Sequence, residues 1–308
     1  LGIQKNDEVI LPDMTFVATG NAILNVGATP VIADVNNDMN ISLDSIKENI
    51  TSKTKAIIPV HFAGKMCDIK NIKKIAKTNN LFLIEDCAHA IGAKFENKHA
   101  GTFGDAGCFS FYPTKNITTI EGGMVICNSK NTAQGIQSFR NHGITRTLKQ
   151  RFSAGKPWDY DEIEPGYNFR LDEIRASLGI SQLKKISKLN NMRRKACEYY
   201  TSKLKKIKGI ESPEISKSTD NAFHLYIIKI KKDYGISRDK LFLKLLDSGI
   251  RTSVHYKPLH DFTIFKKMAK IKRGLNNSTT LYNEILSLPL YPTITQQEQD
   301  YVIHNLKN

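Results

Sequence analysis

The feature that most constrains the fold is a regular alternation of short apolar runs with segments of helical period. The runs are bounded by turn residues and apolar on both faces: "EVILP" (8–12), "TPVIADV" (29–35), "KAIIPVH" (55–61) and "LFLIEDC" (81–87). The helical segments between them cover 15–27, 41–50 and 68–80. Strands that are apolar on both faces and separated by helices form parallel sheets covered on both sides. The sequence therefore predicts an α/β fold with a mainly parallel sheet.

A second region follows Asn168. The stretch 171–207 has helical periodicity without an internal proline, which predicts a connecting helix or a bent pair of helices. Further on, "FHLYIIKI" (223–230) and "RTSVHY" (251–256) predict strands. The stretch "SRDKLFLKLLDSG" predicts a helix with Ser237 as its N-cap, and the last two segments also predict helices.

We therefore expect a large domain over 1–190 and a smaller α+β domain over 191–308. Between them, the Gly- and Pro-containing stretch 145–166 is the best candidate for a long, mobile loop. The chain begins at Leu1, and we expect that residue to be an interior point of a longer protein.

Composition is that of a globular protein, with 308 residues of which 40% are hydrophobic and 24% charged. No apolar run is long enough to cross a bilayer and no signal-peptide pattern is present, so we expect a cytoplasmic protein without a membrane partner. Five cysteines without CxxC pairs predict reduced, largely buried thiols: Cys67, Cys87, Cys108, Cys127 and Cys197.

The net charge of +15 raises the alternative of nucleic-acid binding. The lysines are, however, spread over helical faces among Asn and Ile, which favours a solvated surface over a binding patch. We expect no nucleic-acid partner, although such a field attracts anionic small molecules.

One lysine has an unusual setting. Lys115 follows "AGCFSFYPT", a predicted buried strand that leads into a tight, proline-containing turn. An ammonium ion is costly in apolar surroundings, so the pKa of the amine is expected to fall, and a neutral amine is a nucleophile towards aldehydes. The alternative is a solvated surface lysine at a turn.

A carboxylate at the end of a neighbouring predicted strand gives this lysine a partner. Asp86 ends "LFLIED", and ligands of parallel sheets sit beyond the carboxyl ends of the strands. The cofactor pyridoxal 5'-phosphate (PLP) needs such a pair of residues. The lysine carries its aldehyde as a Schiff base, and the carboxylate keeps its pyridine nitrogen protonated. Asp86 also fits a plain helix N-cap, and both roles are compatible.

Several longer motifs, in order along the chain, closely resemble the DegT/DnrJ/StrS family of PLP-dependent sugar-nucleotide aminotransferases. They cover 11–35, 57–64, 84–125, 139–146, 166–185 and 252–260. The resemblance implies the aspartate-aminotransferase type of fold (PLP-dependent transferase fold type I) and a homodimer whose active sites are shared between subunits. Members normally begin with a further stretch that helps to hold the cofactor phosphate, and this chain lacks it, so we expect a fragment without its N-terminal segment.

The resemblance assigns roles residue by residue. Lys115 matches the Schiff-base lysine, and Asp86 matches the partner of the pyridine nitrogen. His89 matches a position that approaches the phenolic oxygen side of the cofactor. Two further cofactor contacts follow, with Phe16 matching the aromatic residue that stacks on the ring and Ser110 a hydroxyl that binds the phosphate.

Contributions from the partner subunit and contacts with the substrate are implied less directly. Asn168 matches an asparagine that reaches the phosphate from the neighbouring subunit. His255 and Tyr256 lie in a segment that borders the substrate sugar in the family, with core or rim roles as the alternative. Glu121 and Arg170 are weaker candidates for the same site.

A metal site is not expected. His61, His89, Cys67 and Cys87 are possible zinc ligands by type, but their spacing fits no common zinc motif and a core role for the thiols is favoured.

The function implied is transfer of an amino group from L-glutamate to a nucleotide-linked keto-sugar, with the 4-keto form favoured over the 3-keto form, for lipopolysaccharide or a related surface polysaccharide or glycan. Two alternatives on the same fold stay open. A PLP-dependent sugar dehydratase is disfavoured because we expect histidine at the position of Lys115 in such relatives. A non-catalytic regulator is disfavoured, without being excluded, by the intact Lys115 and Asp86.

Overall fold

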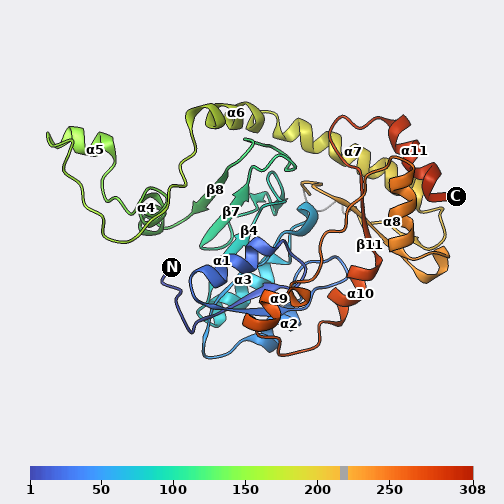
Figure 1. Cartoon of the computed structure of the whole chain (residues 1–308), viewed down its shortest axis with the longest axis horizontal. Coiled ribbons are helices and arrows are strands. Elements are labelled where there is room, and N and C mark those ends of the chain that lie inside the picture. Colours follow the sequence, from blue (N-terminus) through green and yellow to red (C-terminus); the bar gives the residue numbers. More distant parts are fainter. Residues whose placement is uncertain (216–220, 308) are drawn as a thin grey trace.

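The computed structural model describes residues 1–215 and 221–307, and its centre is a six-stranded sheet (Figure 1). The strands are β1 (Glu8–Pro12), β2 (Thr29–Ala33), β3 (Thr54–Ile57), β4 (Phe82–Asp86), β7 (Ala106–Ser110) and β8 (Gly123–Cys127). Their order is β2-β1-β3-β4-β7-β8; the first five are parallel to their neighbours and β8 is antiparallel to β7. The predicted α/β fold with a mainly parallel sheet is confirmed.

Three helices connect the first strands. They are α1 (Val17–Asn25), α2 (Leu43–Asn49) and α3 (Ile69–Thr78). Capping fixes where two of them begin, because the side chains of Ser42 and Asp68 accept hydrogen bonds from backbone N–H groups in the first turns of α2 and α3. All three were predicted from helical periodicity.

A second, three-stranded antiparallel sheet has the order β11-β10-β9. Its strands are β9 (Ile210–Glu211), β10 (Tyr226–Ile230) and β11 (Ile285–Leu288), and α8 (Arg238–Asp247), α7 (Ile186–Leu204) and α11 (Gln296–Lys307) contribute to its core. Ser237 is the N-cap of α8, as predicted. Figure 1 shows α6 (Glu173–Leu183) and α7 following one another from the first sheet to the second, which is the predicted bent pair of helices.

The remaining elements are short: the β5–β6 hairpin (Lys94–Phe95, Lys98–His99), three 3-10 turns (Phe62–Gly64, Lys232–Tyr234, Leu259–Asp261) and the helices α4 (Lys130–Phe139), α5 (Leu148–Ser153), α9 (Thr263–Met268) and α10 (Asn276–Glu284). In Figure 1, α5 lies at the tip of a segment that projects away from the rest of the chain.

The C-terminal part of the chain returns to the first sheet. Leu259, Phe265 and Leu275 are buried in the same core cluster as residues of β1 and β2, and Lys270 forms a bridge with Val31 of β2. The division into domains 1–190 and 191–308 stays a prediction, and residues on either side of it share this core.

Three local predictions need correction. Residues 251–256 form no strand, and their one bridge joins Ser253 to Ser287 of β11. The strand β11 was not predicted. The expected loop 145–166 contains α5, which begins with a capping box between Thr147 and Gln150.

Among the described residues, none of the helices combines the length and the apolar character that crossing a membrane requires. All five cysteines are free thiols, and Cys67, Cys87 and Cys197 are buried, in agreement with the prediction.

Candidate active site

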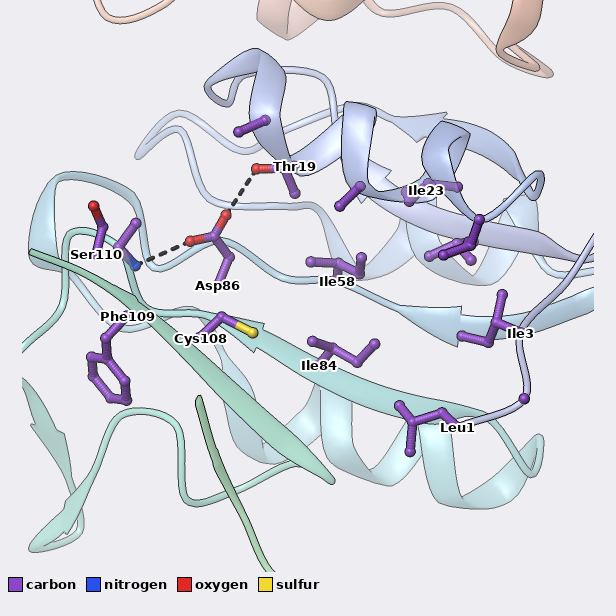
Figure 2. A pocket seen from close by; sticks show the side chains of 16 residues that line it. Leu1, Ile3, Thr19, Ile23, Ile58, Ile84, Asp86, Cys108, Phe109 and Ser110 are labelled. Carbon is purple, nitrogen blue, oxygen red and sulfur yellow. Dashed lines mark hydrogen bonds between the residues drawn. The ribbon is translucent and has the colours of Figure 1, made fainter. Parts of the chain in front are cut away.

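Asp86 ends β4 at the carboxyl edge of the parallel sheet, where the topology concentrates functional groups. Its Oδ2 accepts a hydrogen bond from Thr19 Oγ1 (2.8 Å), and its Oδ1 accepts one from the backbone N–H of Ala88 (3.0 Å) (Figure 2). Thr15 Oγ1 lies 2.9 Å from Thr19 Oγ1. Asp86 is therefore oriented by α1 as well as by the segment that follows its own strand. No local sequence pattern predicts the contact with α1, because the two segments are far apart in the sequence.

Lys115 lies in the turn that follows β7. Its backbone N–H donates to the carbonyl of Tyr112 (2.9 Å), and its side chain is half-buried. Burial lowers the pKa of the amine, and the charge of Asp86 opposes that change. The structure thus places the predicted lysine and carboxylate within electrostatic reach of each other, in surroundings that favour the neutral amine.

The residue after Lys115 anchors this turn. Asn116 Nδ2 donates to Asn190 Oδ1 (2.8 Å) and to the carbonyl of Ala222 (2.5 Å), while its Oδ1 lies 3.0 Å from His224 Nδ1. All three partners belong to the C-terminal part of the chain. Asn116 was not among the residues predicted from the sequence, because its role depends on contacts with residues far away in the sequence.

His89 lies in a buried group of rings. Its Nε2 is 3.0 Å from the hydroxyl of Tyr256, and its ring centroid is 4.3 Å from that of His224. Burial, followed by the charges of Lys115 and His255, lowers the pKa of His89 well below its usual value. Burial and Lys115 likewise lower the pKa of His255 to about 4. Around Lys115 the structure therefore favours neutral imidazoles.

One atom of this group has no partner. His89 Nδ1 is buried and makes no hydrogen bond within the described part of the chain. A buried polar atom without a partner costs free energy, so this nitrogen is suited to a ligand.

Phe16 and Ser110 are the other two predicted cofactor contacts on this chain. Phe16 precedes α1, is 57% exposed, and has its ring centroid 5.9 Å from that of Tyr256. Ser110 ends β7, the strand that pairs with β4, and β4 ends at Asp86. Figure 2 shows Ser110 on the same side of the pocket as Asp86.

A cavity of about 480 Å³ extends from this polar corner along the sheet. Thr19, Asp86 and Ser110 line one part of it, and aliphatic side chains such as Ile58 and Ile84 line the rest (Figure 2).

Within residues 1–215 and 221–307, no contact brings three of the candidates to this cluster. Asn168, Arg170 and Glu121 are exposed. Arg170 Nε donates to Asn168 Oδ1 (2.8 Å), and the backbone of Glu121 bonds with Thr119. A role for Asn168 through a neighbouring subunit stays a prediction, as do the roles of Arg170 and Glu121.

A buried group of possible metal ligands lies on β4 and the segment after β3. Ligand atoms of His61, Glu85 and Cys87 lie within 4.8 Å of one another. Both ring nitrogens of His61 are already engaged, because Nδ1 accepts from the backbone N–H of Cys67 (3.2 Å) and Nε2 lies 3.0 Å from Glu85 Oε2. Glu85 also accepts three backbone N–H groups from the turn 101–104. We interpret this group as a hydrogen-bond network that holds the turn, and the absence of a metal stays a prediction.

A family model described as the DegT/DnrJ/EryC1/StrS aminotransferase family matches residues 1–307. The chain belongs to this family. It is 41% identical over 310 aligned positions to an uncharacterized protein of Methanocaldococcus jannaschii, MJ1066, with all of this chain and 80% of that protein covered. It is 35% identical over 311 positions to the spore coat polysaccharide biosynthesis protein SpsC of Bacillus subtilis, with the same coverage.

Solved structures of sugar aminotransferases superpose on the family member described here. The putative sugar aminotransferase Spr1654 of Streptococcus pneumoniae, in its PMP form, matches with a TM-score of 0.91 and 30% identity, covering 99% of this chain and 82% of that one. Helicobacter pylori PseC, an aminotransferase of pseudoaminic acid biosynthesis, also gives 0.91 and 30%, with 98% and 79% covered. Fold type I and membership of a PLP-dependent sugar aminotransferase family are thereby confirmed.

Two observations show that the residues of this family member fit PLP. The half-buried amine of Lys115 lies within electrostatic reach of Asp86, which suits an aldehyde on one side of the ring and a pyridine nitrogen on the other. The unpartnered Nδ1 of His89 is available to an oxygen of the bound ligand.

Proposed function

We propose that this chain is a PLP-dependent aminotransferase that transfers an amino group from L-glutamate to a nucleotide-linked keto-sugar for a surface polysaccharide or glycan. The family resemblance favours the 4-keto form of that sugar. The names of SpsC and PseC connect similar proteins with spore coat polysaccharide and pseudoaminic acid. The net charge of +15 favours a substrate that carries a diphosphate.

The observation that carries the proposal is the electrostatic pairing of Lys115 with Asp86 at the carboxyl edge of the sheet. Burial lowers the pKa of Lys115 while Asp86 raises it, so the two side chains act on each other. A lysine in place of histidine at this position favours transamination over sugar dehydration.

The residues present divide the work of binding. Lys115 would hold the cofactor covalently through Nζ, Asp86 would face the ring nitrogen, Phe16 would lie on the ring, and Ser110 would bind the phosphate together with Asn168 of the partner subunit. When bound, PLP supplies an electron sink for the substrate carbon that loses a proton.

Proton transfer falls to Lys115. Its Nζ must accept a proton from the substrate carbon and later return one, which requires an amine that is neutral at the working pH. Burial acts in this direction, because it lowers the pKa of Lys115.

The test is the absorption spectrum of the PLP-treated protein, recorded for the wild type, Lys115→Ala and Lys73→Ala before and after L-glutamate. Lys73 is an exposed lysine of α3 and serves as the matched control. We expect a visible band in the wild type and the control that shifts with glutamate, and no such band in Lys115→Ala.

Each other outcome has a distinct meaning. A wild type that never binds PLP would contradict the proposal and favour a regulator without cofactor. A band that ignores glutamate would favour a PLP-binding but non-catalytic protein. A sugar product that has lost water rather than gained an amine would identify a dehydratase.

We also propose a homodimer with shared active sites. The chain exposes large apolar side chains along 152–183, the segment with α5 at its tip and the following α6: Phe152, Trp158, Tyr160, Ile163, Tyr167, Phe169, Ile174, Ile180 and Leu183. Exposed apolar surface of this extent is typical of an interface. Sedimentation of the wild type and of Trp158→Ser/Ile163→Ser tests this, because a monomeric wild type would contradict it.

The compartment proposed is the cytoplasm. Its support is that all five cysteines are free thiols, as expected where thiols are kept reduced.

A further inference from the structure

The buried ring of His89 is held on several sides before any ligand is considered. Its centroid lies 6.0 Å from that of Phe62, edge-on, and 4.3 Å from that of His224. Tyr256 contacts it through the hydroxyl and is itself packed edge-on against Phe62 at 6.0 Å. The plane of the imidazole is therefore fixed by packing, and the open question is which nitrogen carries its proton.

The neighbouring His224 has a defined tautomer. Both N–H groups of Asn116 are used by acceptors, Asn190 Oδ1 and the carbonyl of Ala222. The orientation of Asn190 is fixed in turn, because its Nδ2 donates to the carbonyl of Ile91 (3.0 Å). Asn116 thus presents its oxygen to His224 Nδ1, which must be the protonated nitrogen of that ring.

The direction of the bond between Tyr256 and His89 follows from acid–base strength. A phenol is a good donor and a poor acceptor, whereas an unprotonated imidazole nitrogen is a good acceptor. On this ground we assign the 3.0 Å contact as an O–H donated by Tyr256 to Nε2 of His89. Burial raises the pKa of Tyr256, which keeps that donor proton in place.

We propose that Tyr256 is a positioning residue that fixes His89 as the Nδ1–H tautomer, so that the buried, unpartnered Nδ1 becomes a donor aimed at an anionic oxygen of the bound ligand. This differs from the substrate contact expected for Tyr256 from the resemblance. The identity of the acceptor, the phenolic oxygen of PLP, rests on the proposed function, while the tautomer does not.

Charges around His89 agree with this assignment. Lys115, in the turn after β7, and His255, next to Tyr256, act on it electrostatically, and His224 packs on its ring. Burial and these neighbours lower the pKa of His89, so the ring is neutral and has one proton to place. With Nε2 occupied as an acceptor, that proton goes to Nδ1.

The experiment uses nitrogen-15-labelled histidine and the full chain, before and after PLP is added. Two-bond proton–nitrogen correlation spectra distinguish protonated from unprotonated ring nitrogens, and His89→Gln identifies the signals of His89. We expect a protonated Nδ1 and a hydrogen-bonded, unprotonated Nε2 in the wild type. In Tyr256→Phe the proton should move, fully or in part, to Nε2, and PLP should bind about tenfold more weakly, the loss typical of one hydrogen bond.

Tyr301→Phe is the matched control. Tyr301 lies on α11, away from His89, and its hydroxyl donates to the carbonyl of Ser248 (3.0 Å). Removal of this hydroxyl should leave the His89 signals unchanged. A wild type with Nε2 protonated, or a Tyr256→Phe variant with the wild-type tautomer, would overturn the proposal. A protein that shows the expected tautomers but never binds PLP would instead count against the proposed function alone.

Discussion

Removing the amide of Asn116 should destabilise the protein far more than the loss of one polar side chain usually does. Asn116 is 5% exposed and makes three hydrogen bonds, to Asn190, to the carbonyl of Ala222 and to His224. In Asn116→Ala all three partners stay buried and lose this contact. At about 1 kcal/mol net for each bond, the expected loss in the free energy of unfolding is about 3 kcal/mol, and more if water cannot replace the amide.

Urea unfolding, followed by fluorescence and extrapolated linearly, measures this loss. The control is Asn283→Ala on the surface of α10, where the amide makes one bond, to the carbonyl of Thr279 (3.0 Å). Removal of an exposed amide of this kind should change the free energy of unfolding by less than about 0.5 kcal/mol.

A loss below about 1 kcal/mol in Asn116→Ala would refute the reasoning, since it would mean that the three bonds contribute nothing beyond those made with water. A double-mutant cycle with Asn190→Ala sharpens the test. Because the two amides bond to each other, the two losses should add to more than the loss measured in the double variant.

Three further predictions concern other parts of the chain. The hydrogen bond to Asp13 raises the pKa of His260 in the folded protein. The stability that His260 provides should therefore be complete below its unfolded pKa of about 6.5 and be lost as the pH rises through the raised folded pKa. The urea midpoints of the wild type and His260→Gln should converge over that pH range. Leu241→Ala, in the core of the second sheet, should lower the free energy of unfolding by about 2–5 kcal/mol, whereas Leu243→Ala on the exposed face of the same helix should change it by less than about 0.5 kcal/mol. In Gly107→Ala the new Cβ would lie 2.3 Å from a backbone Cα of the adjacent turn, so a melting temperature equal to that of the wild type would contradict the packing of β7.

The parallel strands were predictable because each is a short run that is apolar on both faces, a pattern produced by burial between two helical layers. The strand β11 was missed since "ILSL" follows α10 without an intervening turn residue, so no boundary signal separates the two. The helix α5 had a usable signal. Its Thr147 and Gln150 form a capping box, a spacing that can be recognised before the structure is known.

The candidate site also contains features that could be predicted from the sequence and features that could not. Lys115 and Asp86 were predictable from local setting and resemblance, because each ends or follows a buried strand. The contacts of Asp86 with Thr19 and of His89 with Tyr256 were not, as the second pair is separated by 167 positions. Side chains that meet only through tertiary packing leave no periodic trace in the sequence.

The long-range contacts of Asp86 and His89 all affect the charge of the basic groups in the site. Lys115, His89 and His255 are basic groups whose pKa values are all lowered, first by burial and then, for the two histidines, by the charge of Lys115. Two charged imidazoles would repel the charged amine and lower the pKa of Lys115 further. They would also compete with Lys115 for the negative charge of Asp86. With the pKa values of both imidazoles lowered, the histidines do not compete with Lys115 for Asp86, whose charge opposes the effect of burial on the pKa of Lys115. His89 can then act as a hydrogen-bond donor through a fixed N–H rather than through a charge. In this proposal Tyr256, which lies in a segment outside the sheet, determines which nitrogen carries that proton.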